Sequence, residues 1–283
     1  MENIPTYSYS RLNSFSTCPY EYYLNYILPH KERPSTVGNG FSAVGTLAHS
    51  VLEDFGNEKL LQFELSQTFL DRFDEEVPNG VRLYFSNGSS RDLTEKYKTQ
   101  CCDFFDKFNG FPDYEQVSAE EDFKVLVKIN EKLMILRGII DCVLRDSNGN
   151  YIVVDFKSKS EFKSEEELKE YSRQLYFYSI WIKYKFGEYP KTMQFLQFRI
   201  GVTTNVIFSE EGLQETLGWI YSQSEKIESE NYWEPYCNNL PATEQRDRKT
   251  GEIKLVEDTF YPDNLCQYRF SCKYSRHYND GNE

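Results

Sequence analysis

The segment from Arg137 to Ser158 constrains the fold of this chain more than any other part of its sequence. Two apolar runs, Gly-Ile-Ile and Ile-Val-Val, flank an Asn148-Gly149 pair, and this arrangement is the strongest short-range signal of a β-hairpin. Strands that are apolar on both faces are typical of a sheet with other layers packed on each side. The segment therefore predicts a hairpin inside a sheet that is covered on both faces.

Charged residues interrupt these apolar runs at Asp141 and Asp155, and Lys157 follows two positions after the second. Side chains alternate between the faces of a strand, so Asp155 and Lys157 point the same way. A three-residue loop with Gly149 in the left-handed conformation would place Asp141 opposite Asp155. A two-residue turn would instead place Asp141 opposite Phe156, with the carboxylates on opposite faces. We expect the three-residue connection.

The two carboxylates and the amine would then share one small patch. Buried carboxylates are costly unless they are paired or bind a metal ion. We therefore predict a divalent-metal site formed by Asp141 and Asp155, with Lys157 balancing its charge. The alternative is a solvent-exposed hairpin with ordinary surface charges, which the apolar runs disfavour.

The composition excludes several classes of protein. With 39% hydrophobic and 16% aromatic residues over 283 positions, the chain can build a core, so global disorder is excluded. It contains no apolar stretch long enough to span a membrane, and its start carries no secretory signal. Seven cysteines, an odd number, favour a reducing compartment over a disulfide framework, so we expect a cytoplasmic protein.

The net charge of −13 opposes a nucleic-acid-binding function. Proteins that bind nucleic acids usually carry a basic footprint. Any nucleic-acid channel in this chain would have to be local, and binding to it would depend strongly on salt concentration.

The order of predicted elements favours an α/β fold with a central mixed β-sheet flanked by helices. Pro19 is expected to kink or divide the first helix. The elements are a helix at 10–28, a mobile loop at 31–45, a helical region at 46–73, a helix at 93–108, strands at 122–129, 133–144 and 151–157, a helix at 164–184, strands at 191–200 and 204–208, a helix at 209–229, and an irregular C-terminal stretch at 231–283.

Three residues outside the hairpin are further candidates. His49 is surrounded by apolar residues near the start of a predicted helix. A lone buried histidine is more often structural than a ligand, but neutral imidazole is a common metal ligand, and a nearby two-carboxylate site raises that possibility. Gln174 and Tyr178 lie four residues apart, hence on one helix face. Gln174 could be a buried hydrogen-bonding group, or it could contact a phosphate or a base.

Six motifs, in order, resemble the RecB-type branch of PD-(D/E)xK nucleases. This branch includes nuclease domains of bacterial recombination helicases, CRISPR-associated adaptation nucleases and phage exonucleases. The resemblance extends from about Leu12 to Cys272. The motifs are Ser-Arg-Leu with Cys18-Pro-Tyr, Gly-Thr-Leu-Ala-His49, Glu121-Asp-Phe, Gly-Ile-Ile-Asp141, Val-Asp155-Phe-Lys157-Ser and Gln174-Leu-Tyr-Phe-Tyr178.

The resemblance implies a single restriction-endonuclease-like domain over 1–283. Its parts would be a helical N-terminal part at 1–115, a catalytic α/β core at 116–230 and a cysteine-containing segment at 231–283. It implies a metal-dependent DNA nuclease, most simply an exonuclease acting on single-stranded DNA or DNA ends in recombination or repair. The alternatives are a catalytically silent nuclease fold that binds DNA ends or proteins, and a cluster-bearing redox sensor.

The resemblance also assigns roles to residues. His49, Asp141 and Asp155 would hold magnesium or manganese, and Lys157 would activate or orient the attacking water. Gln174 and Tyr178 would lie beside the substrate strand. Glu121 is a weaker candidate for a further carboxylate, with Glu120 as its alternative. No phosphate-binding loop ending in Gly-Lys-Ser/Thr is present, so the chain has no recognisable ATP-driven motor. If it processes long duplex DNA, a separate helicase or recombination protein would supply the ends.

Some relatives carry a [4Fe-4S] cluster bound by one cysteine of a Cys-Pro motif and a C-terminal Cys-x2-Cys-x5-Cys pattern. Cys18, Cys266 and Cys272 match this pattern, but Asp263 occupies the remaining cysteine position. Cys237 or His277 could supply the fourth ligand. A structural zinc ion and a lost site are the alternatives.

Overall fold

The computed structural model describes residues 4–85, 88–246 and 251–278. Its central sheet contains β1 (Thr6–Tyr7), β4 (Glu115–Ile129), β5 (Lys132–Arg145), β6 (Tyr151–Lys157), β7 (Thr192–Gln197) and β8 (Val202–Ile207). The order is β1-β5-β6-β7-β8, with β4 paired to β5. β1 and β5 run parallel, as do β6 and β7, whereas the other neighbours are antiparallel. The sheet is therefore mixed, as expected.

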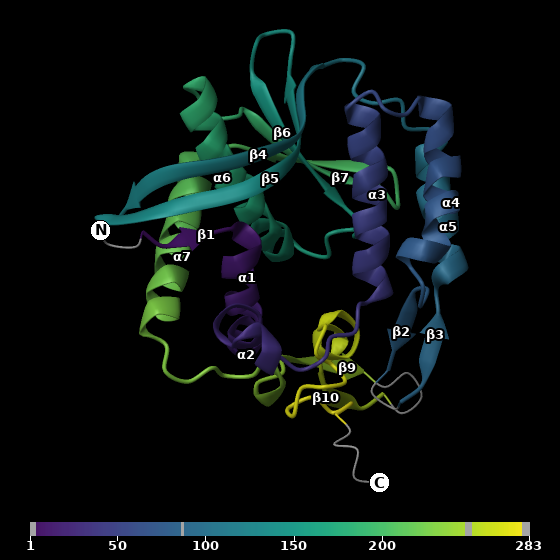
Figure 1. Cartoon of the computed structure of the whole chain (residues 1–283), viewed down its shortest axis with the longest axis vertical. Coiled ribbons are helices and arrows are strands. Elements are labelled where there is room, and N and C mark those ends of the chain that lie inside the picture. The colour runs from purple at the N-terminus through teal and green to yellow at the C-terminus, as the bar shows by residue number, and fades with distance from the viewer. Residues whose placement is uncertain (1–3, 86–87, 247–250, 279–283) are drawn as a thin grey trace.

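Helices cover both faces of this sheet (Figure 1). The first face carries α1 (Tyr9–Thr17), α6 (Glu165–Phe186) and α7 (Glu210–Ser229), and the second carries α3 (Gly40–Gly56), α4 (Leu65–Glu76) and α5 (Thr94–Phe105). Adjacent residues of β6 contribute to different cores, because Val153 packs with the first layer and Val154 with the second. Burial on both faces is what the continuous apolar runs predicted.

The β5–β6 hairpin has the predicted register. Cys142 lies opposite Val154, and the following pairs continue to Arg145 opposite Tyr151. Gly149 has a φ of +86°, and the N–H of Asp146 donates to the carbonyl of Asn150 at 3.0 Å. The connection is thus three residues long, 147–149. Asp141 and Asp155 are the next pair of positions after Cys142 and Val154, on the side away from the turn.

The helical region predicted at 46–73 contains two helices, α3 and α4, joined through η3 (Gln62–Glu64). The loop predicted at 31–45 is shorter, since α3 begins at Gly40. Asn39 caps this helix by accepting a hydrogen bond from the N–H of Ser42 at 2.7 Å. A Cβ at Gly40 would collide with the carbonyl oxygen of Gly80. The glycine therefore permits close packing within a helix, not a flexible loop.

The first predicted helix is divided at Pro19, as expected. α1 ends at Thr17, and Cys18 caps α2 (Pro19–Tyr22), with its Sγ 3.4 Å from the N–H of Glu21. A π-helical turn, η1 (Tyr23–Ile27), and a short 3-10 turn, η2 (His30–Glu32), complete this region.

The C-terminal stretch is more regular than predicted. It contains η4 (Tyr236–Asn238), an antiparallel pair of β9 (Ala242–Arg246) and β10 (Ile253–Glu257), and η5 (Tyr261–Leu265). β10 is exposed along its length. It therefore has no buried face, and a half-buried strand is the kind that alternating apolar and polar residues indicate. A second small pair, β2 (Arg82–Tyr84) and β3 (Ser90–Asp92), was also not predicted. No helix in the described part of the chain is long and apolar enough to span a membrane.

Candidate active site

Four elements bring the predicted site residues together. β5 provides Asp141, β6 provides Asp155 and Lys157, α3 provides His49, and α6 provides Gln174 and Tyr178. Each of these six residues is connected to another of them by a hydrogen bond or an ion pair, or through the backbone of β6.

Asp141 is held between β6 and α3. Its Oδ2 accepts a hydrogen bond from the N–H of Phe156 at 2.6 Å, and its Oδ1 lies 3.3 Å from His49 Nδ1. Phe156 is the residue between Asp155 and Lys157. The carboxylate of Asp141 therefore accepts a backbone hydrogen bond at the end of the ladder, and this bond fixes its position relative to Asp155 and Lys157.

A second chain of contacts begins at Asp155. Its Oδ2 lies 2.6 Å from Lys157 Nζ, which also donates to Gln174 Oε1 at 2.8 Å. Gln174 Nε2 donates to the hydroxyl of Tyr178 at 2.7 Å. Because one end of the amide is bound to Tyr178, its oxygen is directed toward Lys157. The structure thus gives Gln174 a hydrogen-bonding position beside the lysine.

Burial dominates the electrostatics of this site. Asp155 is 1% exposed, and burial raises its pKa to about 6, against the lowering effect of Lys157. Burial would lower the pKa of His49, but Asp141 and Asp155 outweigh it, so the pKa is raised. The pKa of Tyr178 lies well above its usual value because the hydroxyl is buried near Asp155. Tyr178 is therefore neutral at physiological pH.

The donor set suits a hard divalent cation. Two carboxylates and an imidazole are ligands that magnesium or manganese accepts. Oδ2 of Asp155 is buried, and its charged partner among the described residues is the ammonium of Lys157 at 2.6 Å. Among residues 4–85, 88–246 and 251–278, no group of three or more His, Cys, Asp or Glu side chains is already arranged to hold a metal ion. The donors are instead turned toward one another, as the contacts of Asp141 and Asp155 show.

A glycine explains how α6 approaches the strand. A Cβ at Gly138 would lie 2.9 Å from the ring of Phe123 and 3.5 Å from that of Tyr178. The glycine of the Gly-Ile-Ile-Asp141 motif therefore allows both rings to pack over β5. This close approach carries Tyr178, and with it Gln174, to the site.

The additional carboxylate near Asp141 is Glu120, not Glu121. Oε1 of Glu121 accepts hydrogen bonds from Trp181 Nε1 at 3.2 Å and from Lys185 Nζ. The register on either side places Glu120 opposite Asp141. Burial and the neighbouring carboxylates of Glu53 and Asp141 raise the pKa of Glu120.

Sequence reasoning missed Glu53. This residue follows His49 by four positions on α3, so the two share a helix face. That spacing was a usable signal. Glu120 was harder to select over Glu121 because its φ of +49° departs from regular strand geometry.

The four predicted cluster cysteines line one small cavity of about 20 Å³. Cys18 comes from the start of α2, Cys237 from η4, and Cys266 and Cys272 from the C-terminal segment. All four are free thiols. Burial raises their pKa values, that of Cys18 to about 11. Residues separated by more than 200 positions in sequence are thus brought to one place.

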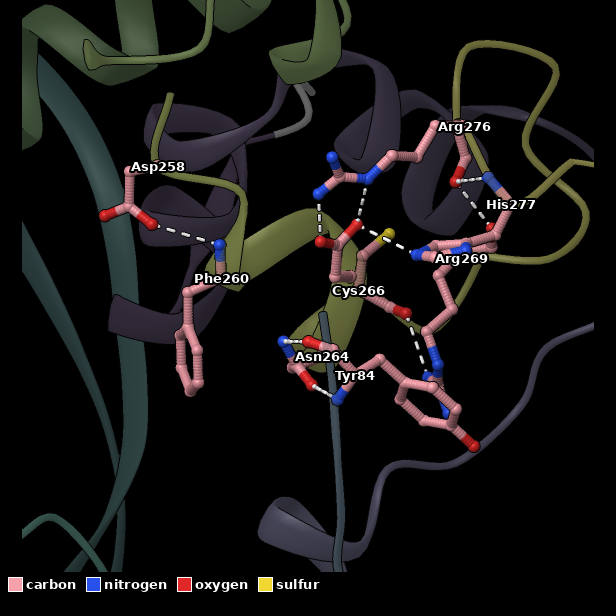
Figure 2. A network of polar contacts seen from close by, with 10 residues as sticks. Tyr84, Asp258, Phe260, Asn264, Cys266, Arg269, Arg276 and His277 are labelled. Atoms are coloured by element: carbon pink, nitrogen blue, oxygen red, sulfur yellow. Dashed lines mark hydrogen bonds and ion pairs between the residues drawn. The ribbon is translucent and has the colours of Figure 1, made fainter. Parts of the chain in front are cut away.

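Asp263 has a separate set of partners in this region. Its carboxylate, 1% exposed, forms an ion pair with Arg276, and its Oδ1 lies 2.9 Å from His277 Nε2. Figure 2 shows Arg276 and His277 within the polar network beside Cys266. Of the two alternatives for the fourth ligand, Cys237 lines the cavity, whereas His277 is directed to Asp263.

The sequence model of the PD-(D/E)XK nuclease superfamily matches residues 6–276. No curated protein matches the chain.

Several solved structures are similar to this one. A protein of Eubacterium rectale described as a candidate exonuclease is 13% identical, with a TM-score of 0.45 over 81% of this chain and 83% of its own. SSO0001 is 13% identical, with a TM-score of 0.36 over 84% of each chain. Rai1 of Scheffersomyces stipitis is also 13% identical, with a TM-score of 0.27 over 90% of this chain and 68% of its own. Because the family match covers nearly the whole chain, this protein belongs to the PD-(D/E)XK nuclease superfamily.

Proposed function

We propose that this nuclease-family protein is a divalent-metal-dependent deoxyribonuclease, an exonuclease that hydrolyses phosphodiester bonds in single-stranded DNA or at DNA ends. The observation that carries the proposal is the proximity of Asp141, Asp155 and Lys157, which lie just beyond the last pair of the β5–β6 ladder. Decay of a nuclease into a binding module would leave no reason to retain all three.

His49, Asp141 and Asp155 would hold magnesium or manganese. Bound there, the ion would supply a water of lowered pKa and stabilise charge that develops on the phosphate. The burial of the Asp155 carboxylate, with the Asp141 carboxylate and His49 close by, supports this assignment. Ion binding would also compensate the cost of keeping that carboxylate out of water, which Lys157 alone offsets only in part.

Lys157 would position the attacking water and balance negative charge on the phosphorus centre. Its amine is held from two sides, by Asp155 and by Gln174. A donor fixed before the reaction stabilises developing charge without the cost of reorientation. Gln174 acts on Lys157 through its oxygen, and Tyr178 fixes the amide, so both are proposed as positioning residues.

The cysteine cavity is proposed as a second, structural centre. Cys18, Cys237, Cys266 and Cys272 would bind a [4Fe-4S] cluster, with a structural zinc ion as the alternative. The convergence of the four thiols on one cavity supports a metal centre there. Because a cavity of about 20 Å³ has the size of one water molecule, the thiols would have to move apart to admit a cluster. A centre at this position would link α2, η4 and the C-terminal segment.

Cleavage of end-labelled DNA tests the nuclease. Single-stranded and double-stranded substrates would be incubated with manganese or magnesium, beside an EDTA control and Asp155→Ala. We expect metal-dependent degradation that the substitution abolishes, with successive shortening from an end. Folded wild-type protein that cleaves no DNA with either metal would contradict the proposal and favour a silent module that binds DNA ends or proteins.

A further inference from the structure

A groove of about 700 Å³ lies between α5, the loop that follows it, and the turn between β7 and β8. We call it the α5 groove. Lys107, Phe108 and Phe111 line it from the α5 side, and Arg199 lines it from the end of β7. Nothing in the proposed chemistry uses these residues.

One residue, Phe198, connects the α5 groove to the candidate active site. Its N–H donates to the carbonyl of Lys157 at 3.2 Å, and its ring centroid lies 6.1 Å from that of His49. On its other side, its ring lies 6.2 Å from that of Phe104, which lines the groove. Arg199 is the next residue in the chain. One buried aromatic side chain, Phe198, thus separates the wall of the α5 groove from His49.

Arg199 is held in place by neutral groups. Its guanidinium lies 3.8 Å from the centre of the Tyr97 ring, and its Nε donates to Gln100 Oε1 at 3.2 Å. No ion pair among the described residues includes Arg199 or Lys107. This is notable in a chain with 45 acidic and 32 basic residues. A fixed arginine without a carboxylate partner is suited to bind a phosphate.

The charge in the α5 groove differs from that of the protein as a whole. Two cations, Arg199 and Lys107, face one carboxylate, Asp103. Phe108 and Phe111 add apolar surface, with their ring centroids 5.6 Å apart in an edge-to-face arrangement. Cations beside aromatic rings are the combination that binds single-stranded nucleic acids, because unpaired bases can pack against the rings.

The groove between α6 and α7 provides a contrast. Its volume is about 640 Å³, and Arg173 lies there with its guanidinium 5.7 Å from the centre of the Trp219 ring. Three glutamates, at positions 165, 211 and 215, line the same groove together with a second cation, Lys169, which pairs with Glu215, so carboxylates outnumber cations there by three to two. They would repel a phosphate backbone, so an arginine stacked on an aromatic ring is not sufficient by itself.

We propose that the α5 groove binds the single-stranded part of the DNA substrate, with Arg199 contacting a phosphate and Lys107 adding a second positive charge. The bases would lie toward Phe108 and Phe111. This inference rests on the proposed nuclease function and specifies its substrate class. It also resolves the conflict between an acidic protein and an acidic substrate, because the basic surface is local and only the Phe198 side chain separates it from His49.

Binding of fluorescein-labelled oligothymidylate, measured by anisotropy in EDTA, tests the inference without cleavage. Arg199→Ala should lower the affinity about tenfold. It should also reduce the slope of log K against log salt by about 0.7, the value for one lost phosphate contact on a single strand. Arg173→Ala is the matched control, and it should bind as the wild type does. Equal affinities for Arg199→Ala and wild type would overturn the inference, as would an equal loss in both variants.

A second variant guards against a folding defect in Arg199→Ala. Lys107 is exposed, so Lys107→Glu should fold normally and still weaken binding. Normal binding by folded Lys107→Glu and Arg199→Ala would exclude the groove.

Kinetics separate this inference from the proposed function. With manganese, Arg199→Ala should raise KM for the oligonucleotide, whereas Arg173→Ala should leave it unchanged. Hydrolysis of thymidine 5′-(p-nitrophenyl phosphate) by the wild-type protein tests the active site alone, because this compound has no second nucleotide to reach the groove. Wild-type protein that hydrolyses neither compound would contradict the nuclease function, while the binding experiment would still decide whether the groove binds DNA.

Discussion

The Oδ2 of Asp141 accepts a hydrogen bond of 2.6 Å from the backbone N–H of Phe156. This contact joins β5 to β6 just beyond their last ladder pair, Cys142 opposite Val154. It places the carboxylate beside the peptide that connects the residue pair Asp155 and Lys157. The side chain thus contributes both to the sheet and to the proposed metal site.

Replacing Asp141 should separate these two contributions. Asp141→Ala removes the acceptor of a largely buried N–H, which should lower the free energy of unfolding by about 1–3 kcal/mol. Asp141→Asn retains an acceptor and should be destabilised less, although both variants should lose cleavage. Urea denaturation and a cleavage assay would measure the two effects. Equal stability of the alanine variant and wild type would show that the contact adds nothing to the sheet.

Lys157→Ala should abolish cleavage while leaving the fold and metal binding largely intact. The loss of one pre-organised group that stabilises developing charge typically lowers kcat about 10²–10³-fold. Lys159→Ala is a matched control two residues away, because Lys159 pairs with Glu167 at 2.7 Å. Single-turnover rates at saturating metal would compare the variants. A wild-type rate for Lys157→Ala would remove this lysine from the mechanism.

Manganese should stabilise the folded protein through the proposed site. A ligand at 100 times its Kd that binds only the native state stabilises it by about 2.7 kcal/mol. The rise in Tm should disappear in Asp155→Asn. It should persist in Glu121→Gln, since the carboxylate of Glu121 is directed to Trp181 and Lys185. An undiminished rise in Asp155→Asn would place the metal elsewhere.

Protein purified without oxygen should contain iron and acid-labile sulfide, or zinc, bound by the four cavity cysteines. Elemental analysis and the visible absorption spectrum distinguish these cases. Cys237→Ser should lose the metal, whereas His277→Ala should retain it, because the imidazole contacts Asp263. Cys102→Ser, outside the cavity on α5, is the control. Metal retained in Cys237→Ser but lost in His277→Ala would reverse the assignment.

Gly138→Ala should destabilise the protein by about 1–3 kcal/mol, because the added methyl group would press on the Phe123 ring. Gly218→Ala, where a Cβ meets only open space on α7, should be neutral or stabilising by up to about 1 kcal/mol. Thermal unfolding measures both. Equal effects of the two changes would mean that the ring moves away without cost.

Much of the site could be predicted from sequence because it is local. The Asn148-Gly149 turn sets the register of the hairpin, and that register decides which side chains of β5 and β6 are opposite. Gln174 and Tyr178 also follow from local geometry, because residues four positions apart lie on the same face of a helix. The position of His49 beside Asp141 followed from the family motif, not from any local rule.

What the sequence by itself determined is therefore the set of features fixed by short-range geometry, namely the hairpin, its register and the helix faces. The tertiary structure alone decided the rest, including the helical start at Gly40, the choice of Glu120 over Glu121 and the shared cavity of Cys18 and Cys237. The physical reason is that these features depend on contacts between distant segments. A carbonyl of Gly80 against Gly40, or a thiol brought from more than 200 residues away, leaves no periodic signal in the sequence.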